Sequence, residues 1–199
     1  MKVAVITFGT SNLDHLNDLS FPNKEAYCKY RGYDFHCSKE NLAAPKHPQW
    51  CKILLCLKYI KEYDWIFWSD TDAVITDFEQ KLEDFIIPGK EAFFCRGGRF
   101  SPGLNSGHFL LKNSQWVIDK LEKAMTIKID NWLQDQGALR RVFHGSKYYH
   151  LYEQTVFNTK LRKHKHGHFI AHAWGDGLKR PKLWKRFKEL AVKEISRIS

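Results

Sequence analysis

The sequence lacks the features that define several large classes of protein. Its five cysteines form no CxxC pair and no even-numbered framework, which argues against a disulfide scaffold and favours a reducing compartment. No apolar run approaches the roughly 20 residues that a membrane helix needs. The apolar start, residues 1–8, is too short and too soon charged for a signal peptide. We therefore expect a soluble, cytoplasmic protein without a membrane anchor.

Two further absences narrow the function. The GxGxxG fingerprint of dinucleotide-binding folds is missing, although Gly9 follows an apolar run at residues 2–8. Acidic residues are scarce near the end: residues 160–199 hold 12 Lys and Arg against 3 Asp and Glu, a net charge of +9 out of +10 for the whole chain. Such a local field favours an anionic partner, although a solvated basic helix without a partner shows the same composition.

The remaining composition is that of a folded chain. Hydrophobic residues make up 43% and aromatic residues 15% of the 199 residues. A chain of that length can bury a hydrophobic core without disulfides or bound metals, so we expect a single domain over residues 1–199. We also expect a basic amphipathic helix at about 182–198.

The order of apolar patterns predicts an α/β fold with a mostly parallel sheet flanked by helices. Helical spacing predicts helices at 22–31, 49–62, 78–87, 115–125 and 131–143. The helix at 115–125 would be capped by Asn113 or Ser114. Short apolar runs predict strands at 2–10, 33–37, 65–72, 92–95, 104–111 and 148–157.

Two carboxylates follow the most apolar of these runs. Residues 65–68 are Trp-Ile-Phe-Trp, typical of a buried strand, and Asp70 and Asp72 come directly after it. Mg²⁺ and Mn²⁺ prefer oxygen ligands, and open α/β sheets bind ligands at the carboxyl ends of their strands. The pattern therefore favours a metal site, although an acidic turn without a ligand would look the same.

Other polar residues fall at positions where the pattern predicts burial. Asp135 shares a helical face with Leu139 and Val142, where an unpaired carboxylate is costly, and Gln136 lies beside it. The histidines of the 164–172 segment alternate as on an extended strand, which favours a polar strand with solvated rings, with zinc or copper binding as the alternative. This alternating set is His164, His166, His168 and His172.

Several separated motifs together resemble one enzyme family. The chain is similar to the retaining GT-A (Rossmann-like) glycosyltransferases. It is most similar to the galactosyl/xylosyltransferases of family 34 and less so to glycogenin-like enzymes, over residues 3 to about 184. Soluble enzymes of algal viruses look similar too. The residues that carry the resemblance are Thr7-Phe8-Gly9, Tyr30 to Tyr33, Trp50 with Lys52, Asp70-Thr71-Asp72, Leu104-Asn105-Ser106-Gly107, Asp135-Gln136 and His172 to Gly175 with Lys179.

The resemblance implies a role for each matched residue. Asp70, Asp72 and His172 would ligate Mn²⁺ or Mg²⁺. Asp135 and Gln136 would be the catalytic residues: Asp135 would contact the donor sugar, and Gln136 would lie beside the reacting carbon. The residues implied in nucleotide-sugar binding are Thr7, Phe8, Gly9, Lys52, Asp70, Thr71, Asn105, Ser106, Gly107, Gly175 and Lys179. Arg180 or Lys182 would replace Lys179 if the longer interval after the histidine displaces it.

The implied reaction transfers a sugar from a UDP-sugar donor to a glycan or glycoprotein acceptor, with retention of configuration. No nucleic-acid partner is expected, and an enzyme without an anchor fits a bacterial protein or one that works in the cytoplasm of a virus-infected cell. Two other functions stay open. A nuclease or nucleotidyltransferase with two metals would need further acids near Asp70, and only Asp77 and Asp135 are candidates. A polyanion-binding module would use residues 160–199.

Overall fold

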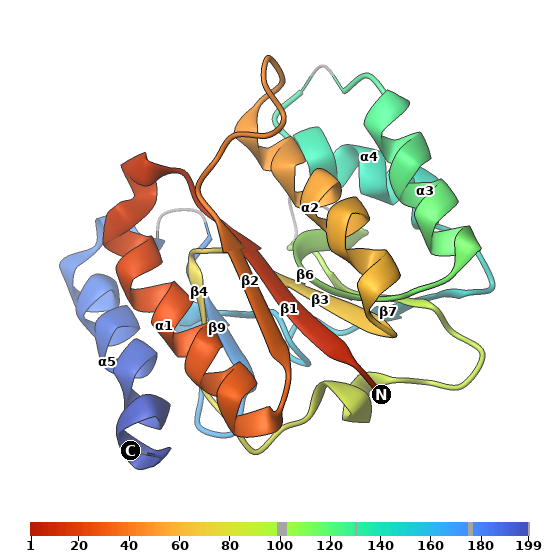
Figure 1. The fold of residues 1–199 in the computed structure, drawn as a ribbon. Helices are drawn as coiled ribbons and strands as arrows, with labels where there is room; N and C mark the ends of the chain where they lie inside the picture. Colours follow the sequence, from red (N-terminus) through yellow and green to blue (C-terminus); the bar gives the residue numbers. More distant parts are fainter. Residues whose placement is uncertain (99–102, 130, 175–176, 199) are drawn as a thin grey trace.

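A computed structural model describes residues 1–98, 103–129, 131–174 and 177–198. The described chain forms a twisted central sheet with helices on both faces, as expected for an α/β fold (Figure 1). The predicted α/β class is therefore confirmed.

The main sheet has six strands in the order β2-β1-β3-β6-β5-β7. Three of its five neighbouring pairs are parallel, and both antiparallel pairs involve β6. The sheet is thus mostly parallel, with one reversed strand. Its strands are β1 (Val3–Phe8), β2 (Asp34–Ser38), β3 (Trp65–Ser69), β5 (Ala92–Arg96), β6 (Leu104–Lys112) and β7 (Tyr149–Tyr152).

A second sheet continues the chain beyond the end of β3. It contains β4 (Ala73–Ile75), β9 (Ile170–His172) and β8 (Thr159–Lys160), in the order β4-β9-β8. Because β9 pairs antiparallel with β4, it brings His172 directly opposite Ala73. Two parts of the chain about a hundred residues apart therefore meet beside the aspartates.

The helices divide between the two faces of the main sheet (Figure 1). The apolar cluster on one face contains residues of α2, α3 and α4, and the cluster on the other contains residues of α1 and the small sheet. A third cluster joins α1, α5 and the small sheet. These helices are α1 (Asp14–Arg31), α2 (Cys51–Tyr59), α3 (Gln115–Thr126), α4 (Gln134–Phe143) and α5 (Pro181–Ile198). Short 3-10 turns lie at Ser11–Leu13, Pro48–Trp50, Ile60–Glu62, Leu82–Phe85, Leu161–Lys163 and Gly177–Lys179.

Alternation along β3 explains why its side chains are so apolar. Ile66 and Trp68 pack with the α2 side of the core, whereas Trp65 and Phe67 pack with the α1 side. All four are buried. A strand buried on both faces is anchored along its whole length, so the residues that follow Ser69 start from a fixed position.

Three predicted helices differ from the structure. The helix expected at 22–31 begins at Asp14, with Pro22 inside it. The segment 78–87 contains only the short turn Leu82–Phe85. The helix expected from residue 131 begins at Gln134. At α3, Ser114 provides the cap, since its hydroxyl accepts from the Val117 N–H at 3.2 Å.

None of the described helices is both long and apolar enough to cross a lipid bilayer. The five cysteines are free thiols, and four of them are buried.

Candidate active site

The carboxyl ends of β1 and β3, together with the amino end of the antiparallel strand β6, form one wall of a cavity of about 650 Å³. Most of the candidate residues named from the sequence lie there. Those that line it are Phe8, Gly9, Lys52, Asp70, Thr71, Asp72, Asn105, Ser106, Gly107, Asp135, Gln136 and His172. Residues far apart in the sequence therefore meet at one site, as expected for the open edge of an α/β sheet.

The two aspartates are fixed by backbone hydrogen bonds on both sides. The Asp70 N–H donates to the Gly107 carbonyl of β6 at 2.9 Å, and the Asp72 carbonyl accepts from the Ala173 N–H at 2.8 Å. The segment between β3 and β4 is thus tied both to the main sheet and to the strand that carries His172. This connection fixes the spacing of the three side chains.

One oxygen or nitrogen atom from each of Asp70, Asp72 and His172 lies within 4.8 Å of the other two. Within the ranges that the structure describes, this is the one group of three or more such side chains close enough to share an ion. Ligands about 2.1 Å from an octahedral ion lie about 3 Å apart when adjacent and about 4 Å apart when opposite. The residues therefore fit a bound divalent cation.

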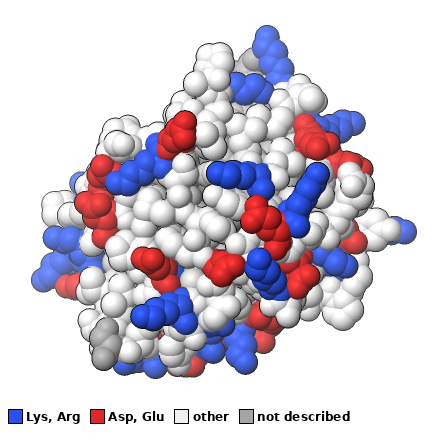
Figure 2. All heavy atoms as spheres, in the orientation of Figure 1, with Lys and Arg blue, Asp and Glu red and all other residues white. Residues whose placement is uncertain are grey.

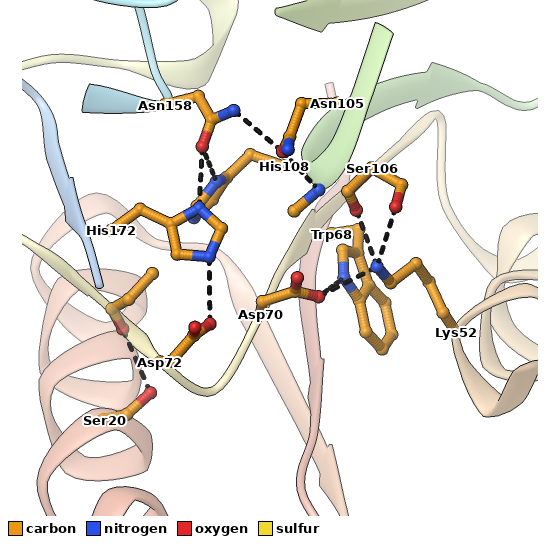
Figure 3. Close-up of polar contacts among 12 residues, drawn as sticks. Ser20, Lys52, Trp68, Asp70, Asp72, Asn105, Ser106, His108, Asn158 and His172 are labelled. Atoms are coloured by element: carbon orange, nitrogen blue, oxygen red, sulfur yellow. Dashed lines mark hydrogen bonds and ion pairs between the residues drawn. The ribbon is translucent and has the colours of Figure 1, made fainter. Parts of the chain in front are cut away.

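Asp72 and His172 form the tightest contact of the group. The His172 Nε2 atom lies 2.9 Å from an Asp72 carboxylate oxygen (Figure 3). Burial alone would raise the pKa of Asp72, but the imidazole charge and hydrogen bond outweigh it and lower that pKa. The Asp72 carboxylate is thereby held ionised, which is the form that binds a cation.

Asp70 belongs to a second polar group centred on Lys52. The Lys52 ammonium lies 3.0 Å from Asp70 and 3.1 Å from Asp135, and it donates to the Ser106 carbonyl at 2.8 Å. Burial would lower the pKa of Lys52, but the two carboxylates outweigh it and raise that pKa. The lysine is therefore a permanent positive charge between two acids.

Asp70 is less easily ionised than Asp72. Burial raises its pKa, and repulsion from Asp72 acts in the same direction, against Lys52. The Trp68 indole N–H also donates to the Asp70 carboxylate at 2.7 Å (Figure 3). The sequence predicts Trp68 only as part of a buried strand, so this polar contact is visible in the structure alone.

Asp135 and Gln136 lie in the first turn of α4 and face Ser106 of β6. Ser106 donates to the Asp135 carboxylate at 2.9 Å, and the Gln136 side-chain oxygen accepts from the Ser106 N–H at 3.2 Å. Asp135 is buried. The expectation that a carboxylate on this helical face needs partners is therefore met by Ser106 and Lys52.

Three of the expected site residues lie away from the cavity or outside the described residues. Thr7 is buried and does not line the cavity, and its hydroxyl has no hydrogen-bond partner among the described residues. Lys179 is exposed and does not line the cavity. Gly175 falls outside the described residues. Thr71 does line the cavity, but its hydroxyl donates to Asn17 at 2.7 Å and so serves the packing of the wall.

The alternating histidines do not form one strand face. Within this segment only Ile170–His172 forms a strand, and His164 is buried with its Nε2 atom 2.7 Å from the Thr76 hydroxyl. In the described part of the chain, His164, His166 and His168 belong to no group that could hold a metal ion. A zinc or copper site along this segment is therefore not supported.

A two-metal nuclease and a polyanion-binding module are not supported either. Asp77 does not line the cavity, and Asp135, which does, is paired with Lys52 and is not part of the group that could hold an ion, so the described residues do not assemble the acids required for two metals. In the basic α5 helix, Lys185 and Arg197 each form an ion pair with an acid of the same helix, and Arg197 also pairs with an acid outside it. Figure 2 shows basic and acidic residues interspersed on the face it displays, rather than one continuous basic surface.

Several residues of the site are not evident from the sequence. Asn158 and His108 are buried beside His172, and exposed Trp132 lines the cavity. Asn158 stands between Phe157 and Thr159 with no motif around it. Only its contacts with residues more than ten positions away reveal it.

Comparisons with solved structures identify the fold. A glycosyltransferase involved in glycosylation of the PBCV-1 major capsid superposes with a TM-score of 0.74 at 11% identity, covering 96% of this chain and 98% of that one. The galactosyltransferase LgtC gives 0.64 at 14% identity, covering 96% and 95%. A Drosophila β1,4-galactosyltransferase 7 mutant, crystallised with manganese, UDP-Gal and xylobiose, gives 0.55 at 10% identity, covering 90% and 74%. The chain therefore has the GT-A glycosyltransferase fold.

The sequence also matches a particular family. The profile of the galactosyl transferase GMA12/MNN10 family matches residues 3–93. Galactomannan galactosyltransferase 1 of Cyamopsis tetragonoloba is 32% identical over 119 residues, which cover 55% of this chain and 27% of that protein. This confirms the resemblance to the galactosyl/xylosyltransferases. The chain spans only about a quarter of that relative's length.

Proposed function

We propose that the chain is a metal-dependent glycosyltransferase that moves a sugar from a UDP-sugar donor to a hydroxyl group of a glycan acceptor, with retention of configuration. One observation carries the proposal. Asp70, Asp72 and His172 converge on a shared position at the wall of a cavity that also contains Lys52 and Asp135. The fold and the family resemblance support the same reaction.

The proposed metal ligands are Asp70, Asp72 and His172, and the ion is Mn²⁺ or Mg²⁺. A dication bound there would serve as a Lewis acid for the charge that develops on the leaving diphosphate. Its remaining coordination positions would be filled by phosphate oxygens and water. The crystallisation of a protein of the same fold with manganese and UDP-Gal supports this assignment.

The nucleotide would bind at the Phe8 and Gly9 end of the cavity. A Cβ atom on Gly9 would lie 2.1 Å from the Asn17 side-chain oxygen and 3.1 Å from the Thr71 Cβ. A side chain at Gly9 would therefore clash with Asn17 of α1 and crowd Thr71, so glycine lets the chain after β1 pack closely against both α1 and the segment that contains the aspartates. This packing keeps the nucleotide wall and the proposed diphosphate site together.

Lys52 and Asp135 would position the donor sugar. The Asp135 carboxylate can accept from sugar hydroxyls, while Lys52 neutralises it and limits its reactivity as a nucleophile. We therefore favour a front-face displacement, in which the acceptor oxygen bonds to the anomeric carbon as the bond to the diphosphate breaks. The acceptor proton passes to the leaving diphosphate oxygen, and Gln136 lies beside the reacting carbon.

Trp132 marks the side from which the acceptor would enter. Its indole is 70% exposed, lies just before α4 and lines the same cavity as Asp135 and Gln136. An exposed aromatic face at the mouth of a polar cavity provides a flat apolar surface. The apolar face of a sugar ring has the shape to stack on it.

Asp72→Asn tests the proposal, because it removes the charge of one metal ligand and preserves its size. We expect Mn²⁺-dependent turnover of UDP-sugars, measured as UDP release, to fall by at least a hundredfold. Asp77→Asn is the matched control, since this acid lies outside the cavity. Equal turnover by the wild-type chain and Asp72→Asn would contradict the proposal.

The donor is best identified by thermal shift. A ligand that binds only the folded chain raises its melting temperature, by an amount that grows with concentration over Kd. We expect UDP-sugars to stabilise the chain only when Mn²⁺ or Mg²⁺ is present. The absence of any stabilisation by nucleotide sugars with either metal would count against the donor assignment.

A further inference from the structure

Behind the proposed metal ligands lies a chain of side-chain amides that begins at the backbone. The Gly107 N–H donates to the Asn105 side-chain oxygen at 2.8 Å. A backbone N–H can only donate, so the side-chain atom of Asn105 that faces it must be the oxygen. The orientation of the Asn105 amide is therefore set by β6 itself.

This orientation determines the next amide. The same Asn105 oxygen lies 2.8 Å from the side-chain nitrogen of Asn158. Two amide oxygens in contact would repel, so the group of Asn158 that faces Asn105 must be its NH₂. The Asn158 oxygen then points in the opposite direction, toward the histidines (Figure 3).

Two imidazoles meet the Asn158 oxygen. It lies 2.7 Å from the Nδ1 atom of His172 and 3.1 Å from the Nδ1 atom of His108. An amide oxygen only accepts, so both Nδ1 atoms must carry a proton. His108 is completely buried, and burial lowers its pKa well below the ordinary value, so this second ring is a neutral donor.

We propose that Asn158 is a positioning residue that fixes His172 with its proton on Nδ1 and its Nε2 atom directed at the cation site. The inference rests on the proposed function, because it takes His172 as a ligand. A metal-bound histidine is generally oriented by an acceptor on its other ring nitrogen. Here the orientation passes from Gly107 through Asn105 and Asn158 to His172.

The geometry on the other side of the ring agrees with this assignment. The His172 Nε2 atom lies 2.9 Å from the Asp72 carboxylate, so either a proton or a cation must join the two acceptors. Because Asn158 holds the Nδ1 proton, Nε2 is the nitrogen whose lone pair is offered to a cation. His172 is only 2% exposed, so little water competes for that position.

Titration with MnCl₂ in the presence of UDP, followed by electron paramagnetic resonance, tests the inference. Asn158→Ala removes the acceptor and should weaken Mn²⁺ binding about 10- to 100-fold. Asn158→Asp keeps an acceptor for the His172 N–H, so its Mn²⁺ affinity should stay within about threefold of wild type or become tighter, even though a carboxylate facing Asn105 reduces stability.

Asn23→Ala is the matched control. Asn23 is as deeply buried as Asn158 and makes three hydrogen bonds to backbone groups of β4 and α5, but it does not contact His172. We expect this variant to lose thermal stability and to bind Mn²⁺ as wild type does. A purely structural role for Asn158 would make the two alanine variants behave alike.

A second readout needs no metal. Nitrogen-detected NMR of ¹⁵N-histidine-labelled protein reports which ring nitrogens carry protons, and Nδ1 of His172 should be protonated in wild type. An unprotonated Nδ1, or equal Mn²⁺ affinity in wild type and Asn158→Ala, would overturn the inference. A wild-type chain with protonated Nδ1 that binds no Mn²⁺ would instead defeat the proposed metal dependence and leave Asn158 as the residue that orients His172.

Discussion

Gly107→Ala offers a direct steric test of the site. Gly107 lies in β6, and its φ angle is not among the positive values of the chain, so alanine is acceptable to the backbone. A Cβ atom there would nevertheless lie 2.3 Å from the Cε1 atom and 2.9 Å from the Nδ1 atom of His172. The imidazole occupies the space that a side chain would need.

The size of the effect follows from these distances. Carbon atoms pack at about 3.5–4.0 Å, so the His172 ring would have to move by more than about 1 Å. The backbone at Gly107 is held on the β3 side, where its carbonyl accepts from the Asp70 N–H, whereas the pairing of β6 with β5 is interrupted between Asn105 and Phe109. Overpacking of this kind costs about 1–3 kcal/mol of stability. A ligand displaced that far leaves an octahedral ion's preferred geometry, so we expect Mn²⁺ affinity to fall at least tenfold.

Mn²⁺ titration with UDP, together with thermal unfolding, measures both effects. Gly98→Ala is the matched control, because its Cβ would meet no atom of the described residues within 4 Å and its φ is not positive. It should bind Mn²⁺ like wild type. If Gly107→Ala folds and binds Mn²⁺ with unchanged affinity, the ring is not held where the metal site requires it, and the steric reasoning is wrong.

Three further predictions concern other parts of the cavity and the fold. Lys52→Met should destabilise the chain by about 3–5 kcal/mol in urea denaturation, since it leaves the buried Asp135 carboxylate without its cation. Trp132→Ala should raise KM for a glycan acceptor and leave UDP-sugar hydrolysis unchanged, whereas equal effects on both would place the indole elsewhere in the reaction. Burial lowers the pKa of His164 from 6.5 to about 4, so the unfolded chain binds more protons between these values. The contribution of His164 to the free energy of unfolding is therefore complete above pH 6.5 and is lost as the pH falls toward 4. The variant His164→Gln should remove this pH dependence, which amounts to up to about 3 kcal/mol. If stability measured by denaturant unfolding changed with pH in the same way for wild type and His164→Gln, this prediction would be wrong.

The elements anchored by long apolar runs could be predicted from the sequence. The run before Asp70 is buried on both faces of the sheet, so burial and strand formation predict the same structure. The cap at Ser114 is predictable for a similar reason, because its hydroxyl acts only on the adjacent turn. A structural feature can be predicted from the sequence wherever the interacting residues lie close together in the chain.

The start of α1 could not be predicted in this way. Residues 14–21 are rich in polar side chains, and Pro22 suggests a helix start. In the structure, polar residues of α1 are buried against the small sheet: Ser20 donates to the Ala73 carbonyl and Asn23 to the Ile75 carbonyl. Their partners lie about fifty positions away, so the segment resembles a loop until the tertiary contacts are known.

The same limit separates the proposed metal ligands from the residues that orient them. Asp70, Asp72 and His172 are residue types with an intrinsic affinity for cations, so their chemistry is visible in the sequence. Asn158 has no such affinity; its contribution depends on which of its two amide atoms faces the imidazole. That choice is made by a backbone N–H at Gly107, about fifty residues earlier, through Asn105. Because an amide can be turned either way, only the complete set of contacts determines the proton on His172, and with it the atom that this ring offers to a cation.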